Sequence, residues 1–461
     1  MMRRYLFLQG VCSPFFRCLG ESLRSKGHYV AKVNFNGGDA LSWLGGNAVA
    51  YRGRVDGLAD FYAQQVERRK ISDVVLFGDQ RPVHRIMTQQ AKALGIRVHV
   101  YEEGYFRPHW VTLEQDGVNA HSHLPRDPDW YMRACEHVPH VKSGSPLPSP
   151  FRVRAWHDVM YHMGSIANPL MFPRYRTHSP VIAPIEYLHY IKRGVRLPLQ
   201  VGRDAGRLEG FLSSGQPYYF LPLQLGSDAQ ILAHSPFNCM NDVLRYVLES
   251  FAHNAPASTS LIIKNHPLDP GLVRYTKQIS KLCSDLDISG RVLYVETGDT
   301  PLLVKHAVGV VTVNSTVGSS ALLHRRPTKT LGSAIYDMPG LTHQGDLDGF
   351  WCNPEEPDMR LFRAFRDVVI HATQIDGGFY TGVGISRACK NSMQALVGEQ
   401  SALQRLLDLV KVEPKVWEGP SSSGANRVRT AGLQKSAQED SSVSLSAPLS
   451  DVGTTMSGGF R

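Results

Sequence analysis

The segment ISDVVLFGDQRPVHRIMTQQAKALGIRVHVYEEG (71–104) carries the pattern that decides the fold. Its apolar run Val74–Phe77 predicts a strand, Val83–Leu94 predicts a helix, and Val98–Tyr101 predicts a second strand. Short apolar runs that alternate with helical segments are typical of a doubly wound parallel sheet. The alternation begins upstream, with expected strands at Tyr5–Leu8 and Tyr29–Phe35 and expected helices at Phe15–Lys26 and Leu58–Arg69.

A second alternating series starts near residue 216. Two separate series in one chain predict two α/β lobes that face each other across a cleft. The segments Met359–Ala372 and Leu403–Val410 are expected to be helices that complete the second lobe or cross back to the first. The other expected elements of this series are strands at Tyr218–Leu221, Leu261–Lys264, Val292–Val295, Val308–Val313 and Lys329–Leu331, and helices at Asn241–Phe251, Leu272–Cys283 and Val317–His324.

The length of 461 residues suits two domains with appendages. We expect a first lobe over 1–138, a basic and aromatic bridging region over 139–215, and a second lobe over 216–412. Residues 413–461 are rich in Ser and Gly and poor in aromatics, so we expect a disordered tail.

Charge and composition narrow the class of partner. The formal net charge of +9 favours an anionic partner, such as a membrane surface, a phosphorylated ligand or nucleic acid. The basic residues cluster in the bridging region and no known nucleic-acid motif is present, so we set nucleic acid aside. The seven scattered cysteines fit a reducing compartment, and no apolar stretch is long enough to span a bilayer. We therefore expect a cytoplasmic protein, soluble or peripheral to the membrane.

Polar residues gather where the expected strands end, and parallel sheets bind their ligands beyond the carboxyl ends of their strands. The alternative is that turns are always rich in residues that cap helices. That alternative explains Ser13 and Gly37-Gly38 well, but it explains the adjacent carboxylates Glu102-Glu103 and the Lys264–Pro267 cluster poorly. The residues concerned are Gln9, Ser13, Asn34, Asn36 and Asp39, then Gly78–Gln80 and Glu102–Gly104, and in the second series Gln224, Asp228, Lys264–Pro267, Glu296-Thr297 and Asn314–Thr316.

Two of these clusters suit a phosphate. Asn314-Ser315-Thr316 closes a strand and opens a helix whose first turn contains Gly318, and a helix N-terminus is a ready anion site. A simple N-cap is the alternative for this cluster. Lys264 and His266 can supply hydrogen-bond donors to the same phosphate.

We expect carboxylates on both rims of the cleft. Glu102 and Glu103 share one loop, so one can have a raised pKa and serve as acid or base. Asp228 belongs to the other rim. Glycosyl transfer with retention by a covalent route needs a nucleophilic carboxylate and a second group that deprotonates the acceptor hydroxyl. The strings Asp127-Pro128-Asp129 and Asp346-Leu347-Asp348 lie outside the strand ends and are expected on the surface, so we expect no metal.

The stretch Phe151–Arg207 interleaves aromatic and basic residues, with nine Arg or Lys against three acids. Such segments suit an anionic lipid surface. A solvated face packed by its own aromatics is the alternative.

Several long motifs resemble the capsule polysaccharide biosynthesis and export proteins of the KpsS type. The resemblance spans about residues 3–410 and leaves out the tail. The motifs are FLQGVCSPFFRCLGESLRSKGHYVAKVNFNGGD (7–39), YEEGYFRP (101–108), LPLQLGSDAQI (221–231), KNHP (264–267), VTVNSTVGSSAL (311–322) and LGSAIYDMPGLTHQG (331–345).

The resemblance implies a GT-B-like retaining β-Kdo transferase. Such an enzyme takes Kdo from CMP-β-Kdo without a metal cofactor and places it on lyso-phosphatidylglycerol at the inner face of the inner membrane, alongside other capsule synthesis and export proteins. Its acidic-acidic-Gly turn corresponds to Glu102-Glu103-Gly104, its HP pair to His266-Pro267, and its Ser-rich phosphate loop to Ser315-Thr316. Here Ser-Thr replaces Ser-Ser, which preserves both hydroxyls.

The resemblance also implies a role for each candidate residue. Asp228 would be the nucleophile and Glu103 the acid/base, although the choice between Glu102 and Glu103 stays open. A non-catalytic export or assembly factor that holds the lipid-linked chain is the main alternative, and a sugar-nucleotide epimerase ranks below it. Lys264, His266, Pro267, Glu296, Asn314, Ser315, Thr316 and Gly318 would bind the CMP-sugar, and Gln9, Ser13, Asn34, Asn36 and Asp39 would face the acceptor.

Overall fold

A computed structural model describes residues 2–44, 46–141, 147, 151–175, 183–225 and 235–411, with the backbone alone for 183–188 and 190–191. The expected nucleophile Asp228 and the expected tail over 413–461 lie outside the described residues.

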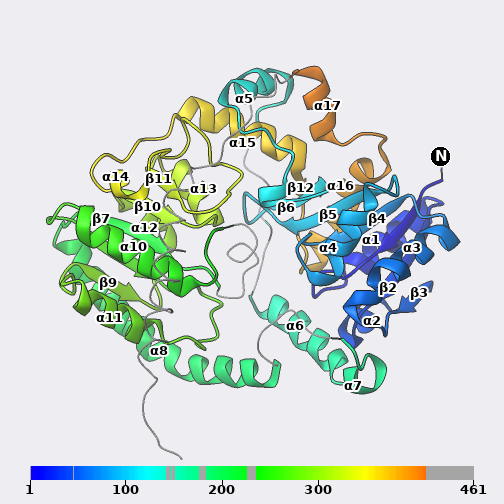
Figure 1. The fold of residues 1–461 in the computed structure, drawn as a ribbon, viewed down its shortest axis with the longest axis horizontal. Helices are drawn as coiled ribbons and strands as arrows, with labels where there is room; N and C mark the ends of the chain where they lie inside the picture. The colour runs from blue at the N-terminus through cyan, green and yellow to red at the C-terminus, as the bar shows by residue number, and fades with distance from the viewer. Residues whose placement is uncertain are drawn as a thin grey trace, which may run out of the picture. The chain divides into compact units, whose positions relative to one another are not determined.

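The first sheet has seven strands in the order β12-β6-β5-β4-β1-β2-β3 (Figure 1). Strands β5, β4, β1, β2 and β3 are parallel to one another. Strand β6 runs antiparallel to β5, and β12 runs antiparallel to β6. The strand order reverses between β1 and β4, which is the switch point where such sheets bind ligands. The bounds are β1 Arg4–Phe7, β2 Tyr29–Asn34, β3 Ala48–Ala50, β4 Asp73–Phe77, β5 Arg97–Glu103, β6 Trp110–Gln115 and β12 Gln374–Asp376.

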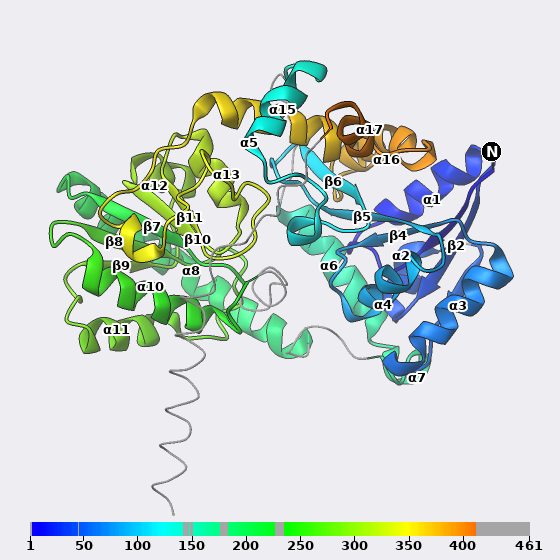
Figure 2. The same ribbon diagram turned by 45° about the horizontal axis from the view of Figure 1, so that its top comes forward.

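Helices cover both faces of this sheet because successive strand residues point to opposite sides. Figure 2 shows α1 and α16 on one face of the sheet and α3 and α4 on the other. Tyr5 and Phe7 of β1 pack with α1 and α16, whereas Leu6 packs with α3 and α4. Helix α2 begins at the end of β2, where Asn36 caps it. The bounds are α1 Phe15–Ser25, α2 Gly37–Trp43, α3 Leu58–Arg69, α4 Pro82–Ala91 and α16 Gly382–Val397.

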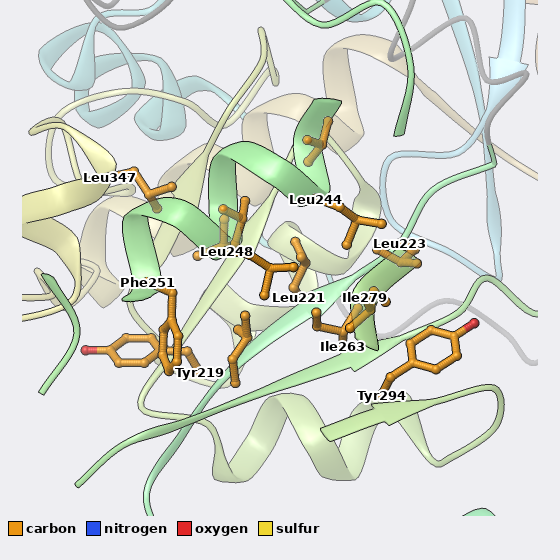
Figure 3. Close-up of a cluster of buried hydrophobic side chains, with 14 of the residues drawn as sticks. Tyr219, Leu221, Leu223, Leu244, Leu248, Phe251, Ile263, Ile279, Tyr294 and Leu347 are labelled. Carbon is orange, nitrogen blue, oxygen red and sulfur yellow. The ribbon is translucent and has the colours of Figure 1, made fainter. Parts of the chain in front are cut away.

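The second sheet has five parallel strands in the order β11-β10-β7-β8-β9, with its switch point between β7 and β10. Figure 3 shows how Leu244, Leu248 and Phe251 of α10 meet Leu221 of β7, and Leu223 just after β7, in its core. The bounds are β7 Tyr218–Pro222, β8 Ser260–Lys264, β9 Val292–Val295, β10 Gly309–Thr312, β11 Thr328–Thr330, α8 Ala183–Ser213, α10 Met240–Asn254, α11 Tyr275–Asp285, α12 Thr300–His306, α13 Thr316–Leu323 and α14 Leu347–Phe350.

The two α/β series thus form two Rossmann-like sheets, which confirms the expected fold class. The expected end of the second lobe at residue 412 needs correction, because the chain returns to the first sheet after α15 (Met359–Thr373). Strand β12 pairs with β6, and Ile385 and Cys389 of α16 join the core around α1. This pairing covers a strand edge that β6 would otherwise leave open. Helices α5 (Pro128–Ala134) and α17 (Ala402–Leu409) pack with α15 in a separate apolar cluster.

The expected bridging region divides between the two sheets. Helix α6 (Phe151–Ser165) and the short α7 (Asn168–Met171) lie against α2 of the first sheet (Figure 1), whereas Leu208 of α8 belongs to the core of the second. Within the described part of the chain, no helix combines the length and the apolar character needed to cross a membrane. Three short 3₁₀ turns, Val55–Gly57, Asn119–His121 and Cys135–His137, complete the described elements.

Candidate active site

Side chains from the ends of β7 and β10 meet at the switch point of the second sheet. Gln224 donates from Nε2 to Asn314 Oδ1 and accepts the Asn314 backbone N–H at Oε1, both at 3.2 Å. Gln224 is only 4% exposed, so this reciprocal pair is well shielded from water. It fixes the two strand ends at the place where open α/β sheets bind ligands.

Ser315 follows directly and caps α13. Its Oγ accepts the Val317 N–H at 3.2 Å, and its carbonyl accepts the Tyr336 hydroxyl at 2.6 Å. Gly318 lies against the Tyr336 hydroxyl so closely that a side chain there would collide with it. The N-cap that the sequence allowed for this cluster is therefore present, and the Tyr336 contact holds the first turn of α13, with half-buried Thr316, in place.

The loop after β8 is held by a chain of polar contacts. Asn265 donates to Glu296 Oε2 at 2.8 Å and accepts the His266 N–H at 2.8 Å. Tyr294 donates to the other Glu296 oxygen at 2.7 Å. Both carboxylate oxygens of Glu296 are thus engaged, so Glu296 positions Asn265 and, through it, the backbone of His266.

His266 is a neutral hydrogen-bond donor in a positive environment. Its Nδ1 accepts the Leu268 N–H at 3.1 Å, which leaves the proton of the neutral ring on Nε2. Burial, together with the positive charges of Lys264, Arg107, Arg154 and Arg193, lowers the pKa of His266 to about 4. Cations that repel a protonated imidazole attract an anion, so this environment suits a phosphate or carboxylate ligand.

Helix α8 supplies two residues of this site that the sequence pattern did not single out. Arg193 donates to the carbonyls of His266 at 3.4 Å and Pro267 at 3.2 Å, and to that of Asp269. It also lies 3.8 Å from Glu296 Oε2. Asp204 accepts the backbone N–H groups of Glu296 at 2.8 Å and Thr297 at 3.0 Å. Both residues lie far from these loops in the sequence, so only the fold reveals their role.

The two adjacent glutamates of the first lobe have different surroundings. Glu103 Oε1 accepts the Tyr380 hydroxyl at 3.1 Å and lies 3.7 Å from the Arg154 guanidinium. Glu102 Oε1 accepts the Glu103 N–H at 2.9 Å. Burial, assisted by the negative charge of Glu103, raises the pKa of Glu102 to about 7. Glu102 can therefore exist with or without its proton near neutral pH, as an acid/base group requires.

Arg154 connects the two parts of the site. It pairs with Glu103 of the first lobe, and its charge lowers the pKa of His266 of the second. Arg107, four residues after Glu103, acts on His266 in the same way. The carboxylates and the donor-rich loop of His266 therefore belong to one electrostatic neighbourhood.

The residues expected to face the acceptor lie in or near a buried network under α6. Tyr161 of α6 donates to Asp39 at 3.1 Å and accepts from Gln9 at 3.0 Å and Asn36 at 2.9 Å. Each of the five expected residues is less than 9% exposed: Gln9, Ser13, Asn34, Asn36 and Asp39. The structure thus brings Gln9, Asn36 and Asp39 together, but it covers them with a tyrosine.

A pocket opens beside this network, at the switch point of the first sheet. Gln9, after β1, and Arg81, after β4, contribute to its wall, and Arg81 donates to Gln9 Oε1 at 3.2 Å. Arg174 and Tyr175, which follow α7, close another side. The remaining lining residues are mostly apolar: Phe35, Tyr51, Gly53, Val55, Leu58, Pro82 and Val83. Ser13 and Asp39 line a smaller neighbouring pocket.

The two Asp-x-Asp strings begin helices. Asp127 accepts the Asp129 N–H at 3.1 Å at the start of α5, and Asp346 accepts the Gly349 N–H at 2.8 Å at the start of α14. Capping accounts for the first aspartate of each string.

Comparison with known proteins identifies the family. The family model described as "Capsule polysaccharide biosynthesis protein" matches residues 72–380. The Escherichia coli "Capsule polysaccharide export protein KpsS" is 37% identical over 82% of this chain and 97% of its own length. The Neisseria meningitidis serogroup B "Capsule polysaccharide modification protein LipB" is 35% identical over 82% of this chain and 92% of its own.

Among solved structures, a Thermosulfurimonas dismutans KpsC described as a "beta Kdo 2,7 transferase" aligns with 88% of this chain and 99% of its own. Its TM-score is 0.42 and its identity 13%. The relatives in E. coli and N. meningitidis confirm the KpsS-type resemblance seen in the motifs, and the chain belongs to the capsule polysaccharide biosynthesis protein family.

Proposed function

We propose that this chain is a retaining glycosyltransferase that moves Kdo from CMP-β-Kdo to a lyso-phosphatidylglycerol acceptor, at the inner face of the bacterial inner membrane, to begin a capsular polysaccharide. The observation that carries the proposal is the neutral Nε2–H donor of His266 among the charges of Lys264, Arg107, Arg154 and Arg193, together with the Glu102 carboxyl, whose pKa is about 7 and which is also influenced by Arg107. Family membership supports the pathway, and the motif resemblance supports the sugar and the acceptor.

The donor would lie at the carboxyl ends of β8 and β10. His266 Nε2–H would donate to the phosphate of CMP, and the first turn of α13, with Ser315 and Thr316, would add its free N–H groups. Lys264 and the neighbouring arginines would balance the charge of a single phosphate and of the sugar carboxylate. We therefore propose that transfer needs no metal.

The two carboxylates would divide the covalent route between them. Asp228 would attack the anomeric carbon as the bond to the CMP phosphate breaks, and CMP would leave with the bonding electrons. The acceptor hydroxyl would then lose its proton to a glutamate and displace Asp228, so that two inversions give retention. We assign the proton transfer to Glu102, because its pKa is near 7, whereas Glu103 is engaged by Tyr380 and Arg154.

The pocket at the first switch point suits the lipid acceptor. Arg81 and Arg174 can bind the phosphate, and the apolar wall formed by Phe35, Leu58 and Val83 can bind the glycerol and the start of the acyl chain. Gln9, expected to face the acceptor, lines this pocket as well.

The direct test is incubation of the purified protein with CMP-β-Kdo and lyso-phosphatidylglycerol, followed by mass spectrometry of the lipid. We expect a product heavier by one Kdo residue and the release of CMP. Asp228→Ala should abolish transfer while the circular dichroism spectrum stays unchanged. Full activity of Asp228→Ala would remove this residue from the mechanism.

The E. coli relative is named an export protein, which favours one second candidate: a non-catalytic factor that holds the lipid-linked chain. It predicts neither a product nor CMP binding. Isothermal titration with CMP therefore separates the two functions even if the acceptor has been chosen wrongly. Turnover of a UDP-sugar without any acceptor would instead favour the epimerase.

A further inference from the structure

The outer side of α6 and α7 carries a stripe of exposed apolar side chains. Trp156 is 62% exposed, Val159 41%, Met163 57%, Ile166 70% and Leu170 89%. The spacing of three or four residues places Trp156, Val159 and Met163 on one side of α6. Ile166, in the turn after α6, and Leu170, in α7, continue the exposed row along the chain. We call these five residues the α6–α7 stripe. Single exposed apolar residues are ordinary, but a continuous row of this size marks a surface that meets something apolar.

Contacts on the opposite side of α6 prevent the stripe from turning inward. His157 Nε2–H donates to the Tyr380 carbonyl oxygen at 3.0 Å, and the Tyr161 hydroxyl donates to Asp39. Gly164 lies so close to Gly37 of α2 that neither position has room for a side chain. Since the inner face of α6 is fixed in this way, the stripe stays exposed.

Exposed basic side chains on α6, just beyond α7 and on α8 select the class of partner. Arg152 is exposed on the same side of α6 by helical spacing, and Arg174 is exposed just beyond α7. On α8, the exposed side chains Val195, at 75%, and Leu199, at 80%, alternate with exposed cations. These cations are Lys192, Arg196 and Arg203. Apolar side chains next to Lys and Arg, in a chain of net charge +9, are the combination that binds an anionic lipid surface.

We infer that the α6–α7 stripe docks this protein on an anionic bilayer, with its apolar side chains at the boundary between headgroups and acyl chains. The inference deepens the proposed function, on which it rests for the lipid nature of the acceptor. Helix α7 leads directly to Arg174 and Tyr175, which line the pocket proposed for that acceptor. A lipid held in the bilayer would thus meet the pocket beside the docked helices.

Vesicle binding without any donor tests the inference. Wild-type protein should co-sediment with phosphatidylcholine vesicles that contain a quarter phosphatidylglycerol, bind pure phosphatidylcholine at least about tenfold more weakly, and dissociate as salt rises. The double variant Met163→Asp/Ile166→Asp should lower the partition coefficient about tenfold or more. The matched control is Val383→Asp/Leu409→Asp, at positions 63% and 61% exposed on other helices, which should bind like the wild type.

Trp156 reports insertion directly. Its fluorescence should shift to the blue when vesicles are added, and Trp156→Phe should keep the binding but lose most of the shift. Equal binding by the Met163→Asp/Ile166→Asp variant and the wild type would overturn the inference. The inference would also be overturned if the wild type were a dimer, this variant a monomer, and vesicle binding the same in both. The stripe would then be a contact between two copies of the chain.

A transfer assay in two formats distinguishes failure of the docking inference from failure of the proposed function. Transfer to a short-chain lyso-phosphatidylglycerol that remains monomeric in solution should be the same in the Met163→Asp/Ile166→Asp variant and the wild type, whereas transfer to vesicle-bound acceptor should fall about tenfold in the variant. Absence of transfer in both formats would reject the transferase and leave the vesicle-binding result standing.

Discussion

Replacement of Glu102 by Gln tests the acid/base assignment and the fold at once. The pKa of this carboxyl rises from its ordinary 4.5 to about 7, chiefly because burial disfavours the charged form. Ionising Glu102 in the folded protein therefore costs about 3 kcal/mol more than in the unfolded chain. Glutamine has almost the same shape and never ionises, so Glu102→Gln removes this cost.

The pH dependence follows from the direction of the shift. Below about pH 4.5 both states hold the proton, and the stabilising effect of the neutral carboxyl is fully present. As pH rises from 4.5 to about 7, the unfolded chain releases the proton first, and the free energy of unfolding of the wild type falls relative to that of the variant. Above about pH 7 the folded protein ionises as well, and the difference levels off at about 1 to 3 kcal/mol in favour of Glu102→Gln.

Urea denaturation of both proteins at pH 5, 6, 7 and 8 measures this difference. Burial also raises the pKa of Glu114 to about 7, but that group titrates in both proteins and cancels in the comparison. In the transfer assay, loss of the proton acceptor should lower kcat about 10²-fold to 10⁴-fold. Wild-type and variant stabilities that run parallel from pH 5 to 8 would refute the reasoning about the pKa of Glu102, and undiminished transfer would refute its role.

Three further outcomes are expected. His266→Ala should weaken CMP binding about tenfold in isothermal titration. The affinity of the wild type for CMP should not rise as pH falls from 7.5 to 5.5, because the pKa of His266 is about 4. A rise in affinity through pH 6.5 that His266→Ala abolishes would contradict the neutral state of His266. Tyr161→Phe should lower the free energy of unfolding by about 1 to 3 kcal/mol by leaving Asp39 and Gln9 short of a partner, and an unchanged urea midpoint would contradict the network. Leu248→Ala, at a fully buried site, should cost about 2 to 5 kcal/mol by the same measurement, and a loss below 1 kcal/mol would mean that this core collapses to fill the cavity.

Apolar periodicity predicted the five strands of the second sheet and four of the seven strands of the first, because these strands are buried on two faces and read as continuous apolar runs. It missed Ala48–Ala50 and Trp110–Gln115 of the first sheet. It also did not predict Gln374–Asp376 as a strand, since QID has neither the length nor the apolar character of one. That strand exists because β6 presents an edge to it, which is a property of the folded sheet. The boundary of the second lobe was placed too late for the same reason.

Candidate site residues could be predicted from the sequence where they lie at the carboxyl ends of strands. The clusters at Lys264–Pro267 and Asn314–Thr316 lie at the carboxyl ends of β8 and β10, the two strands that flank β7 in the second sheet. The sequence could not assign Arg193, Asp204 or Tyr161, because each reaches its partner from a helix far away in the chain. Nor could it separate Glu102 from Glu103, since adjacent residues of a strand point to different surroundings that only packing defines.

The anomeric configuration of the transfer product tests the central proposal most directly. Two-dimensional NMR of the lipid formed from CMP-β-Kdo and lyso-phosphatidylglycerol should show a single Kdo residue in β linkage, as a retaining transferase with one nucleophilic carboxylate requires. An α-linked product would contradict the covalent route through Asp228. No product, together with no binding of CMP, would contradict the transferase itself.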